Sequence, residues 1–176
     1  MKAKAAASSR ARPTSRSARG PRALPAASRT WIQSILVPID FSEASNAALR
    51  YAVRLADQFG ARLTLLHVVE PVATPDFAYY PLMMENDKVV AKAKQALARF
   101  IAKNDLDQNV IEKMLVRNGA PFQEITKAAQ SQKVDLIVIS THGYTGLKHV
   151  LLGSTTERVV RHASCPVLVV RSSYAG

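Results

Sequence analysis

The chain of 176 residues is 48% hydrophobic and 21% charged, an ordinary composition for one globular domain with a single hydrophobic core. Its one cysteine, Cys165, excludes an internal disulfide, and no apolar run approaches the roughly 20 residues that span a bilayer. The net charge of +11 is concentrated at the N-terminus: residues 1–30 hold eight basic and no acidic side chains, whereas the other 146 residues hold 16 basic and 13 acidic ones. The domain that follows the tail is therefore predicted to be nearly neutral.

The tail of residues 1–30 admits three interpretations. It is rich in Arg, Ser and Ala and lacks the apolar segment of a secretory signal. A solvated, disordered extension is the simplest interpretation. An organellar transit peptide and an arm that binds nucleic acid or another polyanion are the alternatives. We expect a cytoplasmic protein without a membrane partner, with organellar targeting by the tail as the alternative.

From residue 31 onward, short apolar segments alternate with segments of helical spacing. The first helix should begin after Ser42, whose hydroxyl can accept a free backbone amide, and should end at Gly60. Residues 70–85, with three prolines and three aromatic residues, predict an ordered flap or lid. The predicted strands are 35–40, 63–69, 110–116, 134–140 and 167–170, and the later helices cover 89–103, begin at Pro121, and cover about 155–162.

This β-α order predicts an α/β domain over residues 31–172, followed by a short C-terminal end, 173–176. Apolar strands connected by helices indicate a mainly parallel sheet with helices on both faces. Ligands of such sheets bind at the carboxyl ends of the strands. The functional residues should therefore follow the first, second and fourth strands.

The segment after the fourth strand has the features of a phosphate-binding loop. Three glycines (Gly143, Gly146 and Gly153) allow the backbone to pass close to a bulky anion. Residues 154–157, Ser-Thr-Thr-Glu, match a capping box, in which Ser154 caps the next helix and Glu157 reaches back to the cap amide. The helix would then offer free amides and a positive dipole to phosphate. A plain strand–loop–helix connection is the alternative, because the chain has neither a Walker GxxxxGK[ST] motif nor a GxGxxG fingerprint.

Several separated motifs, in the right order over about residues 31–172, resemble the universal stress protein family. The resemblance implies an open, flavodoxin-like sheet in the order 3-2-1-4-5. It also implies a homodimer paired along the fifth strand, through Val167, Leu168, Val169 and Val170. The motifs that carry it are Pro38-Ile39-Asp40-Phe41-Ser42-Glu43, Leu65-Leu66-His67-Val68, Val134-Asp135, Ser140-Thr141-His142-Gly143, Gly153-Ser154 and Cys165-Pro166-Val167-Leu168-Val169-Val170.

The same resemblance implies a site for ATP and Mg²⁺. In the ATP-binding branch of the family, the pattern is G-x-x-G, nine residues, then G-[S/T]; this chain has Ser140 at the first glycine, which restricts φ. Asp40 would bind the ribose or adenine side and Val68 would contact adenine through its backbone, while a divalent ion would bridge the phosphates. The implied binding residues are Pro38, Asp40, Val68, Ser140, Thr141, His142, Gly143, Gly153, Ser154 and Thr155.

Other polar residues have simpler interpretations. Asp40 can also serve as a cap for the first helix, and His67, within a strand, is expected to be a hydrogen-bonded core histidine. His142 can donate to an anion or stabilise a turn, and Lys148 can reach a phosphate or face solvent. His149 and His162 lack metal-ligand spacing and are expected at a surface or interface, and the Cys165 thiol, in apolar surroundings, should be inert.

No catalytic constellation is evident in the sequence. There is no GxSxG elbow, and Asp40 is the one carboxylate expected near the site. The sequence therefore predicts an ATP-binding, homodimeric stress-response protein, a nucleotide-dependent regulator with little or no turnover. The alternatives are a nucleotide-free interaction protein of the same family, a nucleic-acid-associated protein acting through the basic tail, and a true ATPase.

Overall fold

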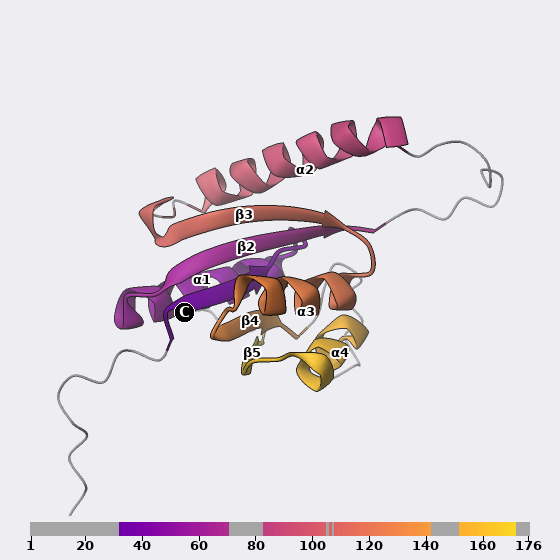
Figure 1. Cartoon of the computed structure of the whole chain (residues 1–176). Coiled ribbons are helices and arrows are strands. Elements are labelled where there is room, and N and C mark those ends of the chain that lie inside the picture. Colours follow the sequence, from indigo (N-terminus) through magenta and orange to yellow (C-terminus); the bar gives the residue numbers. More distant parts are fainter. Residues whose placement is uncertain (1–31, 71–82, 105, 107, 142–151, 172–176) are drawn as a thin grey trace, which may run out of the picture.

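Five strands form one parallel sheet. The computed structural model describes residues 32–70, 83–104, 106, 108–141 and 152–171. The strands are β1 (Ser34–Pro38), β2 (Arg62–Val69), β3 (Ile111–Asn118), β4 (Leu136–Ser140) and β5 (Val167–Val170). Their order is β3-β2-β1-β4-β5 and every pairing is parallel (Figure 1). Both the parallel sheet and the predicted strand order are confirmed.

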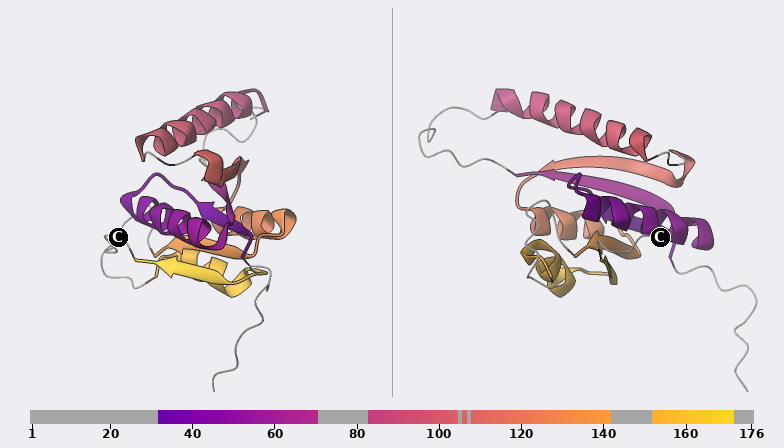
Figure 2. Two further views of the ribbon diagram at one scale, coloured as in Figure 1. Left: turned by 90° about the vertical axis from the view of Figure 1, so that its left-hand side faces the viewer. Right: turned by 180° about the vertical axis from the view of Figure 1, so that it is seen from behind.

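Helices cover both faces of this sheet, as predicted. The helices are α1 (Glu43–Phe59), α2 (Met83–Lys103), α3 (Pro121–Gln132), α4 (Ser154–His162) and the short 3₁₀ turn η1 (Gln108–Val110). Side chains of α1 and α2 share one apolar core with the sheet, and those of α3 and α4 share a second core on the opposite face (Figures 1 and 2). All five residues of β4 are buried, because the strand is covered on both faces. Within the described ranges, no helix is long and apolar enough to cross a membrane.

The ends of α1 and α3 match the local signals in the sequence. The Ser42 hydroxyl accepts the Ser45 amide, and Gly60 ends α1 in the left-handed conformation with φ of 66°. Pro121 occupies the first turn of α3, where its missing amide leaves no hydrogen bond unmade. These predictions are confirmed.

Several predicted boundaries were wrong. β1 ends at Pro38 instead of residue 40, β3 begins at Ile111, and β4 begins at Leu136 instead of residue 134. Asp135 lies before β4 because its carboxylate accepts the amides of Gln33 and Ser34, at 2.8 and 3.0 Å, and so ties the β4 entry to the start of β1. The helix predicted over 89–103 begins at Met83, so residues 83–85 of the predicted flap are helical. Residues 71–82 of that flap lie outside the described residues.

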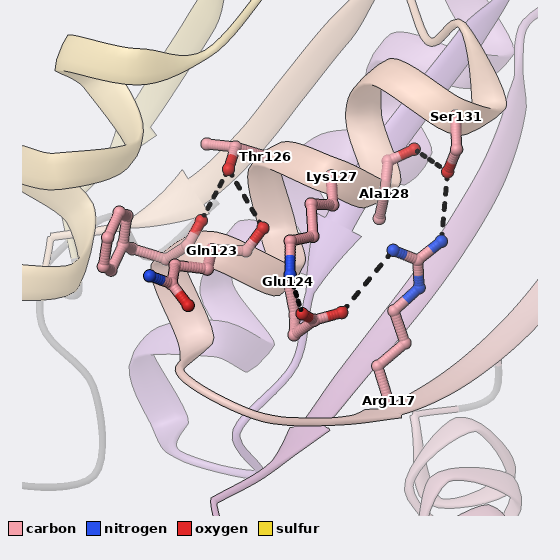
Figure 3. A network of polar contacts seen from close by, with 8 residues as sticks. Arg117, Gln123, Glu124, Thr126, Lys127, Ala128 and Ser131 are labelled. Atoms are coloured by element: carbon pink, nitrogen blue, oxygen red, sulfur yellow. Dashed lines mark hydrogen bonds and ion pairs between the residues drawn. The ribbon is translucent and has the colours of Figure 1, made fainter.

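A polar network attaches β3 to α3 near the turn at Gly119 (Figure 3). The Glu124 carboxylate pairs with Lys127 at 2.9 Å and with Arg117 at 3.7 Å. Arg117 also donates to the Ser131 hydroxyl at 3.0 Å. Gly119 has φ of 144°, and a Cβ placed there would lie 3.1 Å from Cγ of Glu124. The turn therefore requires glycine for its backbone and for its space.

We expect Gly119→Ala to lower the free energy of unfolding by about 2–3 kcal/mol, because it combines a disfavoured φ with a close contact. Gly60→Ala is the matched control, since Gly60 also has a positive φ but open space around its Cβ position. That control should cost only about 1 kcal/mol. Urea denaturation measures both values. Equal losses in the two variants would show that the contact with Glu124 has no effect on stability.

Candidate functional site

A cavity of about 360 Å³ lies at the carboxyl edge of the sheet, next to the ends of β1, β2 and β4. It opens on the side covered by α3 and α4, because its apolar wall includes Leu66, Ile125 and Ile139 of the second core. Small-molecule sites of parallel sheets occupy this position. The cavity is lined by Pro38, Ile39, Asp40, Ser45, Leu66, Val68, Glu70, Pro121, Ile125, Ile139, Ser140, Gly153, Ser154, Thr155 and Thr156.

Val68 presents its backbone to this cavity. The carbonyl of Leu66 accepts the Ile39 amide at 2.8 Å, so it points toward β1. Two residues later, the N–H and C=O of Val68 point the same way. β1 has ended there, and its last pair with β2 is Pro38 with Leu66. The Val68 peptide groups are therefore placed to meet a polar edge of a ligand.

Asp40 lines the cavity and also orders the turn into α1. Its Oδ1 accepts the Ser42 amide at 3.0 Å and the Ser42 hydroxyl at 2.6 Å. Ser42 in turn caps α1 by accepting the Ser45 amide at 3.1 Å. Asp40 thus supports the cap without being the cap, and among the described residues no partner contacts its Oδ2. One carboxylate oxygen is held by the turn, and the other is available to a ligand.

The backbone next to Asp40 is strained. Phe41 has φ of 65°, a conformation that bulky side chains rarely adopt. Its ring lies 4.5 Å from the ring of His67 and 5.7 Å, edge to face, from the ring of Phe100. Nδ1 of His67 donates to the Ile39 carbonyl at 2.8 Å, so the predicted hydrogen bond is confirmed, but the side chain is half-buried and not part of the core. These contacts hold Phe41 in place and thereby fix the direction of Asp40.

The first turn of α4 forms the opposite end of the cavity. The N-cap is Gly153, which makes no side-chain cap, so the predicted capping box with Ser154 as the cap is wrong. Ser154 is the first residue of α4, and the carboxylate of Glu157 pairs with Arg161 at 2.8 Å instead of reaching back. The amides of Ser154, Thr155 and Thr156 consequently have no intrahelical acceptor. Together with the helix dipole, they form a donor set suited to an anion.

Hydrogen bonds hold this first turn against the sheet. The buried Thr156 hydroxyl donates to the Ser140 carbonyl at 2.8 Å. The Gly153 amide donates to the Thr141 carbonyl at 2.7 Å, so that amide is not available to a ligand. The Thr141 amide donates to the Val170 carbonyl at 3.0 Å. These hydrogen bonds attach the first turn of α4 to β4 and, through Thr141, to β5.

The charges of the cavity are carboxylates. Asp40 and Glu70 line it, and none of the described lining residues is Lys, Arg or His. No cluster of three or more His, Cys, Asp or Glu side chains suited to a metal occurs in the described ranges. A phosphate ligand in this setting would bind most favourably with a cation of its own. The pKa of the Cys165 thiol, outside the cavity, is raised by burial and then by the charge of Asp135, as expected of an unreactive thiol.

Seven of the ten residues predicted from the sequence line the cavity. Thr141 is buried behind it, and His142 and Gly143 lie outside the described residues, as do Lys148 and His149. His162 is exposed at the end of α4. The seven lining residues are Pro38, Asp40, Val68, Ser140, Gly153, Ser154 and Thr155. The sequence analysis missed Glu70 and Thr156, and the only signal for Thr156 was its place in the first turn of a helix.

Fold and cavity together define an α/β protein with a helix N-terminus that lines a cavity at the carboxyl edge of its sheet. The family model of the universal stress protein family matches residues 32–171, so the chain belongs to this family. Universal stress protein MJ0531 of Methanocaldococcus jannaschii is 34% identical over 142 residues, covering 79% of this chain and 82% of its own length. MJ0577 of the same organism is similar in structure, with 31% identity and a TM-score of 0.67 over 80% of this chain and 96% of that one. A universal stress protein solved in complex with cAMP is 27% identical, with a TM-score of 0.53 over 81% of this chain and 98% of that one.

Proposed function

We propose that this chain binds ATP, with Mg²⁺, in the cavity at the carboxyl edge of the sheet. The observation that carries the proposal is the uncapped first turn of α4 at one end of a cavity that also has an apolar wall, formed by Leu66, Ile125 and Ile139. The amides of Ser154 and Thr155 would receive the phosphates, and the Val68 peptide groups would contact the base. Asp40 would accept a hydrogen bond from the ribose or the base. A structural relative that binds cAMP supports a nucleotide ligand.

The serine in place of the first motif glycine is compatible with this proposal. Among the described non-glycine residues, only Phe41 and Lys133 have a positive φ. Ser140 therefore does not need the backbone freedom of glycine, and its carbonyl is used by Thr156. The restricted φ of serine at this position is therefore no argument against nucleotide binding.

Mg²⁺ would offset the like charges that meet in the cavity. ATP would bring its phosphates into a cavity that already holds the carboxylates of Asp40 and Glu70. A divalent cation bound with the phosphates reduces that repulsion. The described lining residues include no Lys or Arg that could clamp a transferring phosphoryl group, so we propose regulation by bound nucleotide with little turnover.

We also propose a homodimer paired through β5. The carbonyls of Pro166 and Val170 accept amides of Ile137 and Thr141, so they point toward β4. Backbone direction alternates along a strand, and the N–H and C=O groups of Val167 and Val169 therefore point to the open edge. Their side chains are apolar, and nothing within the strand discourages pairing. Two such edges joined about a two-fold axis would make a closed dimer.

A thermal-shift titration with ATP and Mg²⁺ tests the nucleotide proposal on protein freed of any co-purified nucleotide. At a hundredfold excess over Kd, ATP should stabilise the fold by about 2.7 kcal/mol. ADP, AMP and cAMP in parallel would show how many phosphates contribute, and phosphate release would report turnover. No shift at millimolar ATP would reject the proposal and favour a nucleotide-free interaction protein.

A further inference from the structure

One side of α2 carries a row of positive charges that the cavity does not use. Lys88, Lys92, Arg99 and Lys103 are all exposed. At 100° per residue, these four positions fall within an arc of about 60°, and they extend along roughly 22 Å of helix. We call this set the α2 basic face. In both views of Figure 2, α2 forms one extremity of the described fold, away from α3 and α4.

The charge of the domain is concentrated in this helix. Residues 88–103 contain five basic and no acidic side chains, the fifth being Lys94, which lies off the face. All other residues from 31 onward contain 11 basic and 13 acidic side chains. The first turns of α2 contain Glu85 and Asp87, so the whole helix has a net charge of +3 and its positive charge lies between residues 88 and 103.

A helix face that only needs to be solvated usually carries alternating charges. α4 follows that pattern with Glu157 and Arg161, and α3 follows it with Glu124 and Lys127. On α2, by contrast, Lys88 and Lys92 are four residues apart, and so are Arg99 and Lys103. Like charges at this spacing destabilise a helix. No ion pair joins any of the four to another residue in the described part of the chain.

We infer that the α2 basic face binds the phosphate backbone of duplex nucleic acid, without reading sequence. A linear row of four cations matches a linear polyanion, and lysine and arginine supply the contacts that dominate such binding. The exposed residues of this face include no aromatic side chain. A single strand, which needs stacking, and a protein partner, which needs aromatic anchors, therefore fit less well.

A lipid surface fits less well for a different reason. Amphipathic helices that bind membranes insert an apolar face. Ala93, Leu97 and Ile101 of α2 are buried, and the last two belong to the core shared with α1. Among the described side chains of α2, the one exposed large apolar side chain is Val89, at 40%. A single such residue does not make an apolar face that could insert into a membrane.

The test measures binding of the full-length protein to a fluorescent DNA duplex over a range of salt concentrations. The helix variant carries Lys88→Gln, Lys92→Gln, Arg99→Gln and Lys103→Gln. Loss of four phosphate contacts should reduce the slope of log K against log salt by about 3.6, whatever the tail contributes. The control variant removes four exposed charges elsewhere, through Arg50→Gln, Arg54→Gln, Arg62→Gln and Lys127→Gln, and should retain the wild-type slope.

The helix variant should keep the melting temperature and ATP response of the wild type, because its four side chains are exposed and lie outside the cavity. An unchanged salt slope in this variant would overturn the inference, as would an equal decrease in the control. So would the absence of duplex binding by the wild type at low salt. Anionic vesicles and a single strand are run in parallel, and stronger α2-dependent binding to either would assign the face to that ligand instead.

Discussion

ATP affinity should fall by about 10- to 100-fold in Ser154→Pro, while the fold is retained. Proline is well tolerated at the first position of a helix, and Gly153 before it already has the extended backbone that proline requires, with φ of −65° and ψ of 149°. The substitution deletes one of the free amides at the anion-binding end of the cavity. A hydrogen bond to a charged group contributes about 1.5–3 kcal/mol, which gives the expected loss.

Ser154→Ala is the matched control for that variant. It removes the hydroxyl and keeps the amide, so a small loss in Ser154→Ala beside a large one in Ser154→Pro would assign the binding energy to the backbone. Isothermal titration with ATP and Mg²⁺ measures both affinities, and circular dichroism checks the helix content. Wild-type affinity in a folded Ser154→Pro protein would show that phosphate does not bind at the first turn of α4.

Val169→Pro should convert the dimer into a monomer over the concentrations at which the wild type is dimeric. The Val169 amide points away from β4, and proline is tolerated on an edge strand at such a position. The substitution removes one N–H donor from the open edge of each copy. Because the proposed dimer is two-fold symmetric, it would lose two hydrogen bonds. With about 0.5–1.5 kcal/mol for each of the two hydrogen bonds, dimer affinity should fall roughly 5- to 150-fold.

Val169→Thr is the control, because threonine keeps both the amide and the branched shape. Sedimentation velocity on a dilution series measures the dimer affinity of all three proteins. The Thr variant should remain dimeric. A monomeric wild type would reject the proposed β5 dimer. A Pro variant that dimerises with wild-type affinity would also reject it.

The fold was predictable because its signals are local. Short segments of sequence are enough to predict an apolar strand that is covered on both faces, such as β4. They are also enough to predict helix caps such as Ser42 and Gly60. The boundaries were less predictable. α2 begins six residues earlier than its helical spacing indicated, and the entry to β4 is set by the contact of Asp135 with Gln33 and Ser34, which only the folded sheet brings together.

The candidate site was predictable to a similar degree. The carboxyl edge of the sheet was predictable because strand ends converge there. Asp40 and Val68, which the family resemblance implied as binding residues, both line the cavity at that edge. Ser154 was predicted to be the N-cap of α4 but is its first helical residue. The capping-box pattern of residue types does not distinguish a serine that precedes a helix from one that begins it. Glu70 directly follows β2, so the rule of strand ends could have found it. Thr156 was missed because its contact with the Ser140 carbonyl exists only in the folded chain.

The peptide units on either side of Thr141 join the two proposed functions. The Thr141 amide is held by β5 and the Thr141 carbonyl by the amide of Gly153, so one residue lies between the dimer edge and the anion-binding turn. Thermodynamic linkage between two such neighbouring equilibria is reciprocal. If ATP strengthens dimerisation by some factor, dimerisation strengthens ATP binding by the same factor. The concentration of the protein itself would then set how much nucleotide it retains.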